Sequence, residues 1–339
     1  MFNDSMKPRL NGLVAAPFTV MQADGGLNLN LIEQQAKMLA DNGVRGAFIC
    51  GTTGEGFSLT TEERMLVAER WVAAAPKQLK VIVHVVQNSI GESRKLAEHA
   101  ARIGAHAIAS IGSTFFRPST TERLVEFCAP VAEAARSLPF YYYHMPAMTG
   151  VNPPMTEFLR LGAKRIPNLA GIKFTDENLM SYAQCLNFDN GRFNILFGRD
   201  EILLAALSLG ATGAVGSTYN YMAPIYQQLI AAFQAGDLKT ARRWQMLSIQ
   251  IIAVMTRYGG LPAGKAMMKL VGLDCGPVRP PLQNLTPEEF EAFRQDLERM
   301  GFPAQALILI RFQDEANSGR VGAWQDHAGL IHSSLSGRK

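Results

Sequence analysis

The chain has 339 residues, of which 47% are hydrophobic and 18% charged, and its formal net charge is +4. This composition predicts a globular protein with a large core and excludes a largely disordered chain. The small net charge and the lack of long runs of like charge argue against a nucleic acid or a membrane as partner, so we expect a small-molecule substrate.

Short runs rich in Val, Ile, Phe and Tyr recur along the chain, and helical stretches separate most of them. Thr60 followed by Glu62 and Glu63 is typical of a helix start, and Gly43 and Gly104 are typical of helix ends. The runs are apolar at nearly every position, as in a parallel sheet buried on both faces. Eight such units predict a (β/α)8 TIM barrel, with an open doubly wound sheet as the alternative. The expected strands are residues 12–17, 46–50, 80–86, 107–111, 140–145, 169–174, 193–197 and 213–216.

Three further helices, at 238–258, 263–272 and 286–300, are expected after the eighth unit, with Gly- and Pro-rich breaks between them. The chain therefore divides into a barrel (1–235), C-terminal helices packed on the barrel (236–302) and a loosely ordered tail (303–339) without chemistry.

Barrel enzymes place their chemistry at the C-terminal ends of the strands, so the polar residues at those ends are the candidates. The second strand runs into Gly-Thr-Thr-Gly-Glu-Gly at residues 51–56. Glycines there would bring backbone N–H groups and the hydroxyls of Thr52 and Thr53 close to a small anion such as a carboxylate. The alternatives are a plain tight turn or a phosphate cradle, although the lysine of a P-loop is missing.

The fifth strand ends in three tyrosines followed by His144. Alternation along a strand places Tyr141 and Tyr143 on one face and Tyr142 on the other. A buried tyrosine usually packs with a satisfied hydroxyl, so a catalytic tyrosine needs further support. His144 is interpreted as structural.

Lys173 lies within the apolar sixth strand, and lysine is rarely buried unless it is paired or functional. Burial would lower its pKa and leave a neutral amine able to form an imine with a ketone. The alternative is a lysine at a strand end that extends to solvent along its own aliphatic stem.

The seventh strand is followed by Gly198, Asp200 and Glu201. The two carboxylates could favour a helix N-terminus, or they could bind sugar hydroxyls. The histidines show no metal-ligand spacing, so no metal is predicted.

Taken together, residues 51–56, Tyr143 followed by Pro146, Gly-Ile-Lys at 171–173 and Gly-Ala-Val-Gly-Ser-Thr at 213–218 resemble the dihydrodipicolinate synthase and N-acetylneuraminate lyase family. The resemblance extends from about residue 10 to residue 282 and does not include the tail. It implies a TIM barrel with Schiff-base chemistry on pyruvate-bearing substrates.

The resemblance also implies roles for individual residues. Lys173 would be the imine lysine and Tyr143 the proton shuttle, with Thr53 positioning the tyrosine hydroxyl. Thr52 and Thr53 would hold the pyruvyl carboxylate. Contacts to the sugar chain are implied for Thr175, Gly198, Asp200, Glu201, Gly216 and Ser217. No cofactor would be needed, because the imine through Lys173 is the electron sink.

Within the family, residues 140–147 and 213–221 are most similar to the lyase branch, which cleaves N-acetylneuraminate to N-acetylmannosamine and pyruvate. The synthase branch fits worse, because Met148 replaces an expected arginine, and Phe115 or Phe116 an expected tyrosine. A related aldolase or dehydratase for another 2-keto-3-deoxy sugar acid remains the main alternative. A non-catalytic barrel that binds a keto acid is a further one.

The cysteines Cys50, Cys128, Cys185 and Cys275 lie far apart, which indicates neither a zinc site nor a disulfide framework. Residues 1–10 lack the apolar core of a signal peptide, so we expect a cytoplasmic protein. The family resemblance also implies a homotetramer.

Overall fold

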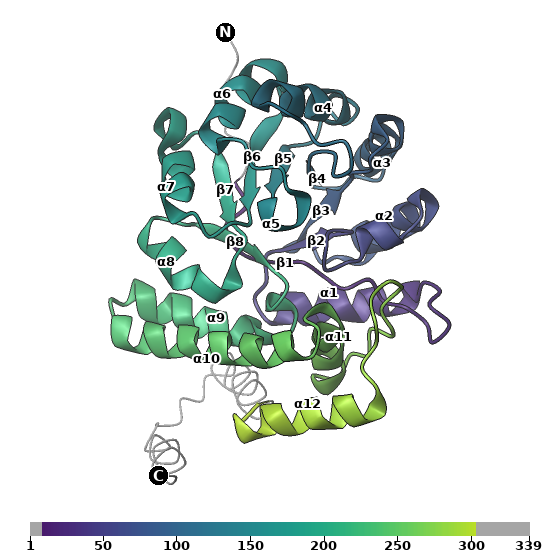
Figure 1. The fold of residues 1–339 in the computed structure, drawn as a ribbon, viewed down its shortest axis with the longest axis vertical. Helices are drawn as coiled ribbons and strands as arrows, with labels where there is room; N and C mark the ends of the chain where they lie inside the picture. The colour runs from purple at the N-terminus through teal and green to yellow at the C-terminus, as the bar shows by residue number, and fades with distance from the viewer. Residues whose placement is uncertain (1–8, 303–339) are drawn as a thin grey trace.

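In the computed structural model, which describes residues 9–302, eight parallel strands form a closed barrel in chain order (Figure 1). Strands β1 and β8 close it, with Leu13 beside Ala214 and Val14 beside Val215. The predicted TIM barrel is confirmed, and the open-sheet alternative is wrong. The strands are β1 Gly12–Ala15, β2 Gly46–Ile49, β3 Lys80–His84, β4 Ala107–Ser110, β5 Phe140–His144, β6 Leu169–Phe174, β7 Asn194–Phe197 and β8 Gly213–Gly216.

Helices follow the strands and surround the barrel. They are α1 Ile32–Asp41, α2 Thr61–Ala74, α3 Ile90–Arg102, α4 Thr121–Glu133, α5 Pro146–Thr149, α6 Met155–Arg165, α7 Leu179–Asn187, α8 Leu203–Ser208 and α9 Tyr219–Gln234. Helix α2 begins as expected, because Thr60 and Glu63 cap each other's backbone in a capping box. Gly43 and Gly104 follow α1 and α3 with φ of +73° and +81°, where glycine avoids the steric penalty of a side chain.

The C-terminal helices α10 Leu238–Arg257, α11 Leu261–Leu270 and α12 Pro287–Arg299 lie together on one side of the barrel (Figure 1). Helix α10 packs along α9, and α12 packs against α10 and α11, which confirms the helical appendix. Helix α11 starts before the predicted residue 263, because Pro262 is tolerated in a first turn, where its missing N–H costs no hydrogen bond. The predicted tail, 303–339, lies outside the described residues.

Alternate residues of the strands separate two apolar layers. Phe48, Tyr141 and Tyr143 belong to the cluster inside the barrel, while Tyr142 belongs to the layer between barrel and helices, where its ring lies 4.4 Å from that of Phe158. The predicted alternation of the three tyrosines is confirmed. Among residues 9–302, no helix has the length and apolar character needed to cross a bilayer.

Candidate active site

Lys173 and Tyr143 lie side by side inside the barrel, because β5 and β6 pair with these two residues in register. Lys173 is 4% exposed. Its Nζ lies 3.9 Å from the centroid of the Tyr143 ring and 4.0 Å from that of Phe48. The lysine is therefore enclosed by aromatic rings, and the alternative of a stem extending to solvent is wrong.

This burial lowers the pKa of the Lys173 amine from 10.5 to about 7, and the negative charge of Asp200 opposes the shift. Desolvation penalises the ammonium form, so a substantial fraction of neutral amine exists near neutral pH. A neutral amine within an apolar enclosure is the nucleophile that imine formation requires.

The Tyr143 hydroxyl lies 3.4 Å from Thr52 Oγ1 and donates to Met145 Sδ at 2.9 Å. Burial raises the pKa of Tyr143 to about 12, and the nearby Thr52 and Thr175 hydroxyls oppose the shift. The phenol therefore stays protonated at neutral pH. It can accept a proton only by passing on its own, as a proton relay does.

The contact expected from Thr53 is made by Thr52 instead. Within the described residues, no hydrogen bond joins Thr53 to Tyr143, whereas the Thr52 hydroxyl is within reach. The turn that carries both threonines is irregular, with left-handed φ of 55° at Cys50 and 53° at Glu55.

Side chains from neighbouring segments hold the turn by hydrogen bonds to its backbone carbonyls. His84 Nδ1 lies 3.1 Å from the carbonyl of Cys50, so Nδ1 is the donor, and Thr19 Oγ1 donates to the carbonyl of Gly54 at 2.6 Å. Gly56 passes so close to Cys50 that a Cβ there would lie 2.0 Å from the Cys50 oxygen. Thr52 and Thr53 remain half-buried, with backbone N–H groups and hydroxyls available to an anion.

Asp200 is a buried carboxylate with one free oxygen. Its Oδ2 accepts from the Thr218 N–H at 3.0 Å and from Thr218 Oγ1 at 2.6 Å, while Oδ1 has no hydrogen-bond partner among the described residues. Burial and the charge of Glu201 raise its pKa to about 6, against the effect of the Thr218 bonds and of Lys173. A buried acceptor without a donor is costly, and a substrate hydroxyl would satisfy it.

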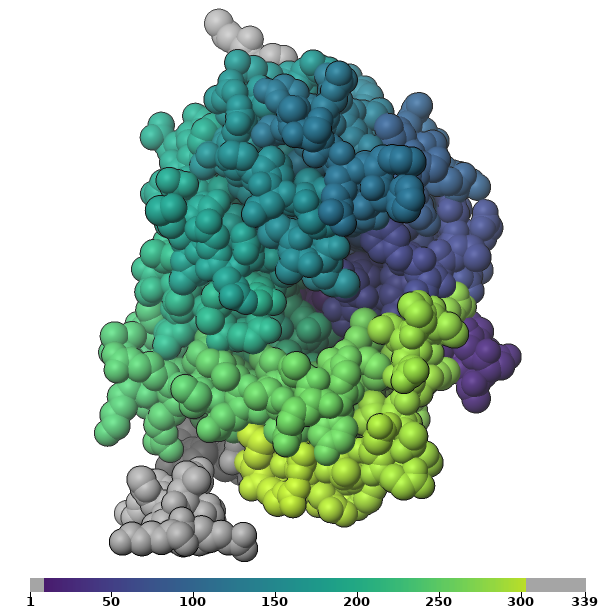
Figure 2. All heavy atoms as spheres, in the orientation of Figure 1, coloured from purple at the N-terminus to yellow at the C-terminus, as the bar shows by residue number. Residues whose placement is uncertain are grey.

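The two glycines among the expected site residues act by leaving space. A Cβ on Gly216 would lie 1.9 Å from Asp200 Oδ1, and one on Gly198 would lie 2.0 Å from Thr175 Oγ1. Thr175 Oγ1 is itself buried and has no hydrogen-bond partner among the described residues. Glu201 and Ser217 are half-buried beside them in the chain. Figure 2 shows a hollow near the centre of the face on which these strand ends lie.

Three residues that contact the predicted ones were not anticipated: Phe48, His84 and Thr218. The rings of Phe48 and His84 meet the Tyr143 ring edge to face, with centroid distances of 5.4 Å and 5.7 Å. Burial lowers the pKa of His84 well below 6.5, with Arg64 and Lys173 adding to the shift, so the imidazole is neutral. The inward alternation of β2 and β3 could have revealed Phe48 and His84, and Thr218 closes the motif at 213–218, but nothing in the sequence indicates its bond to Asp200.

The positions that argued against a synthase lie at the surface. Phe115 and Phe116 follow β4 and are 78% and 84% exposed, and Met148 on α5 is 65% exposed. None of these side chains carries the guanidinium or hydroxyl that the synthase branch would need there. Among residues 9–302, no group of three or more His, Cys, Asp or Glu side chains is placed to hold a metal ion.

Comparisons with known proteins agree with this geometry. Residues 9–300 match the dihydrodipicolinate synthetase family. The N-acetylneuraminate lyase of Mus musculus is 45% identical over 291 residues, covering 84% of this chain and 91% of the mouse protein. The structure of Proteus mirabilis N-acetylneuraminate lyase superposes with a TM-score of 0.85 at 43% identity, covering 87% of this chain and all of that one. A dihydrodipicolinate synthase from Bacillus anthracis has a TM-score of 0.79 at 27% identity, covering 86% and 98% of the two chains.

Proposed function

Because the chain belongs to the dihydrodipicolinate synthetase family, we propose that it is a class I aldolase that cleaves N-acetylneuraminate to N-acetylmannosamine and pyruvate. The observation that carries the proposal is Lys173, an enclosed lysine with a pKa of about 7 beside a tyrosine hydroxyl. The higher identity to lyases than to the synthase supports the sugar acid as substrate.

In the proposed reaction, Lys173 Nζ attacks the C2 ketone of the open-chain sugar acid, and water leaves to give a protonated imine. Tyr143 accepts the proton of the C4 hydroxyl while passing its own proton through the Thr52 hydroxyl to the pyruvyl carboxylate. Thr52 lies 3.4 Å away as the neighbouring hydroxyl. The C3–C4 bond breaks, its electrons move into the imine, and N-acetylmannosamine leaves as the aldehyde. Tyr143 then returns the proton to C3 of the enamine, and hydrolysis of the imine releases pyruvate and the free lysine.

Two groups of residues bind the two parts of the substrate, one its pyruvyl carboxylate and the other its sugar hydroxyls. Thr52 and Thr53 hold the pyruvyl carboxylate through their hydroxyls and backbone N–H groups. The sugar hydroxyls meet Thr175, Asp200, Glu201 and Ser217, while Gly198 and Gly216 keep the space open. The free oxygens Asp200 Oδ1 and Thr175 Oγ1 support this assignment.

The remaining parts of the proposal concern cofactor, assembly and location. No cofactor takes part, because the covalent imine supplies the electron sink. We also propose a homotetramer in the cytoplasm, with the small-molecule substrate and pyruvate as the only ligands. Four buried free cysteines, Cys50, Cys128, Cys185 and Cys275, are consistent with a reducing compartment.

Borohydride trapping with pyruvate tests the imine. The wild-type chain should gain one reduced pyruvyl adduct, and peptide mapping should locate it on Lys173. Lys80→Ala, which removes an exposed lysine at the other end of the barrel, should still be trapped. A Lys173→Ala variant that retains the adduct would overturn the assignment.

A parallel cleavage assay tests the sugar half. N-acetylneuraminate should be cleaved with release of pyruvate, and faster than 2-keto-3-deoxygluconate. Cleavage of 2-keto-3-deoxygluconate alone would reject the lyase and favour a related sugar-acid aldolase.

A further inference from the structure

Glu55 occupies an unfavourable backbone conformation inside the Thr52–Thr53 turn. Its φ of 53° is in the left-handed region, which costs energy for any residue with a Cβ. Its N–H bonds to the carbonyl of Thr52 at 3.0 Å, and the next N–H, of Gly56, bonds to Gly51 at 3.0 Å. The shape of the carboxylate-binding turn therefore depends on Glu55 being held in place.

Both carboxylate oxygens of Glu55 are held by the C-terminal part of the chain. The Glu55 side chain is 1% exposed, and its Oε1 lies 2.9 Å from Nζ of Lys265, a residue of α11 that is 5% exposed. Its Oε2 accepts from the backbone N–H of Arg279 at 2.7 Å. Lys265 Nζ also donates to the carbonyl of Pro277 at 2.5 Å. The charge pair is thus buried, compact and supported by further hydrogen bonds.

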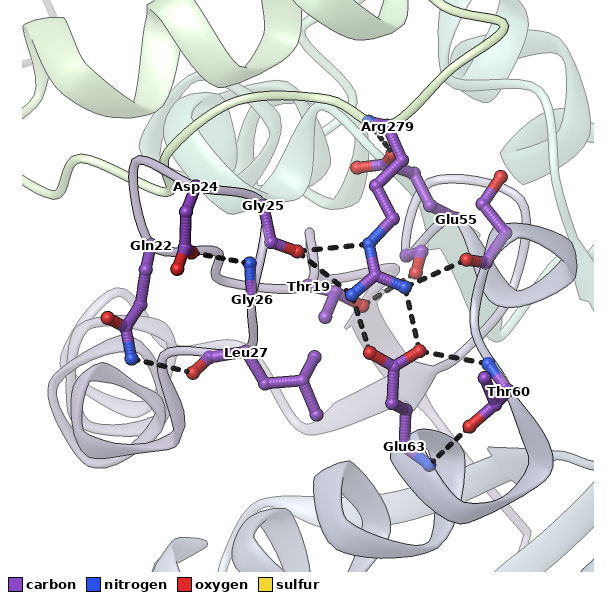
Figure 3. A network of polar contacts seen from close by, with 12 residues as sticks. Thr19, Gln22, Asp24, Gly25, Gly26, Leu27, Glu55, Thr60, Glu63 and Arg279 are labelled. Carbon is purple, nitrogen blue, oxygen red and sulfur yellow. Dashed lines mark hydrogen bonds and ion pairs between the residues drawn. The ribbon is translucent and has the colours of Figure 1, made fainter.

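The Arg279 side chain binds the same segment to the start of α2, which follows the turn a few residues later (Figure 3). Its guanidinium donates to both carboxylate oxygens of Glu63, at 2.7 Å and 2.5 Å, and to the carbonyls of Ser58 and Gly25, each at 2.9 Å. A planar guanidinium that fills two-point contacts of this kind fixes orientation as well as distance. The C-terminal segment therefore holds the turn at Glu55 and also binds Ser58 and Glu63, which follow it.

We propose that Lys265 and Arg279 are positioning residues for substrate binding, acting through Glu55 on the turn that holds the pyruvyl carboxylate. Glu55 is two residues from Thr53, so a displaced Glu55 would rotate the N–H groups and hydroxyls that face the carboxylate. The C-terminal helices then serve the active site directly, beyond covering the barrel. This role rests on the proposed function, since it presumes that the turn binds the carboxylate.

The test is pyruvate-dependent borohydride trapping on the full chain, at a temperature well below the melting point of every variant. Lys265→Met and Glu55→Gln each remove one charge, and Gln retains an acceptor for the Arg279 N–H. Each variant should need about tenfold more pyruvate for half-maximal trapping, because the buried Glu55–Lys265 ion pair no longer holds the turn. The trapped fraction at saturating pyruvate should equal that of the wild type, because Lys173 is untouched.

The double variant Glu55→Gln/Lys265→Met separates positioning from stability. Removing both charges avoids an unpaired buried charge, so its melting temperature should recover relative to the single variants. Under the proposed role, its pyruvate requirement stays raised. If the double variant regained both the wild-type melting temperature and the wild-type pyruvate requirement, the positioning role would be overturned.

Lys269→Met is the matched control on the same helix. It breaks the Lys269–Asp274 pair, in which both side chains are more than half exposed, and that pair does not touch the turn. Its pyruvate requirement should equal that of the wild type. If Lys265→Met does not fold, Glu55→Gln decides the question.

Two negative outcomes are distinguishable. A wild type that pyruvate does not trap would overturn the proposed function and this role with it. A trapped wild type, with half-maximal trapping unchanged in Lys265→Met and Glu55→Gln, would overturn the positioning role alone.

Discussion

Lys173 must be neutral to attack a ketone, so its pKa sets the pH dependence of imine formation. With a pKa of about 7, the rate of trapping with pyruvate should rise about tenfold per pH unit below neutrality and level off above about pH 8. Asp200→Asn should move the midpoint to lower pH, because the Asp200 charge raises the pKa of Lys173. Trapping rates measured from pH 5.5 to 9.5 would contradict this account if they still rose about tenfold per pH unit up to pH 9.5, as an ordinary lysine would give.

The same burial should make Lys173 a cost to the fold. Below pH 7 the Lys173 amine is protonated in both the folded and the unfolded chain, but only the folded chain buries the charge. Between about 7 and about 10.4 only the unfolded state binds the proton, so wild-type stability rises with pH in that window. In urea titrations at pH 6.5, the free energy of unfolding of Lys173→Met should therefore exceed that of the wild type by on the order of 3–5 kcal/mol.

This stability gain should shrink at pH 9.5, and the exposed Lys80→Met should show neither the gain nor its pH dependence. Equal stabilities of Lys173→Met and wild type at pH 6.5 would show that the amine is solvated in the folded protein.

At the scale of elements, the sequence predicts what is local and misses what joins distant segments. The runs that form β3 and β6 are apolar enough to predict buried parallel strands, and their order predicts which strand ends meet. Lys173 was identifiable because it interrupts such a run. The sequence could not show which of Thr52 and Thr53 faces Tyr143, because two adjacent hydroxyls are equivalent until the backbone of the turn is known. That backbone has a left-handed φ at Cys50, a residue type that does not predict one.

Contacts between elements are equally invisible in the sequence. The bond from Thr218 to Asp200 joins the end of β8 to the segment after β7, and the Glu55–Lys265 pair joins residues that are far apart in the chain. Side chains with many possible partners, such as lysine and glutamate, acquire a unique partner only once the fold exists. The short α5, at Pro146–Thr149, was also missed, since four residues carry too little periodicity to predict a helix.

The junction of β8 with the segment after β7 can be tested through Gly216. A Cβ there would lie 1.9–2.4 Å from the carboxylate of Asp200, so Gly216→Ala should displace it and break its bonds to Thr218. We expect kcat/KM for cleavage of the sugar acid to fall about 100-fold. Pyruvate trapping at saturation should persist, since Lys173 and the turn lie on other strands.

Gly91→Ala on α3 is the control for the Gly216 variant. Its Cβ would lie at an ordinary 3.6 Å from Ser89, and a helical alanine is favourable, so activity should be unchanged. Equal loss of cleavage and of trapping in Gly216→Ala would mean that the substitution disrupts the barrel as a whole.

At the scale of the whole molecule, apolar side chains on the loop after β4 and on the neighbouring helix α5 remain uncovered in the single chain. Phe115, Phe116 and Met148 are 78%, 84% and 65% exposed. The two segments touch, because a Cβ on Gly150, at the end of α5, would lie 2.7 Å from the Arg117 guanidinium. Scattered apolar residues are normal on a surface, but a group of three on adjoining segments is typical of a surface that another protein chain covers.

The proposed homotetramer would cover these side chains, and light scattering measures whether it does. The wild type should have the native mass of four chains of 37.1 kDa each, and Phe115→Ser with Phe116→Ser should reduce that mass. Met180→Ser is the control, because Met180 is also exposed, at 72%, but lies on α7, away from those segments. A wild type of single-chain mass would contradict the tetramer. A double variant of unchanged mass would place its contacts elsewhere on the barrel.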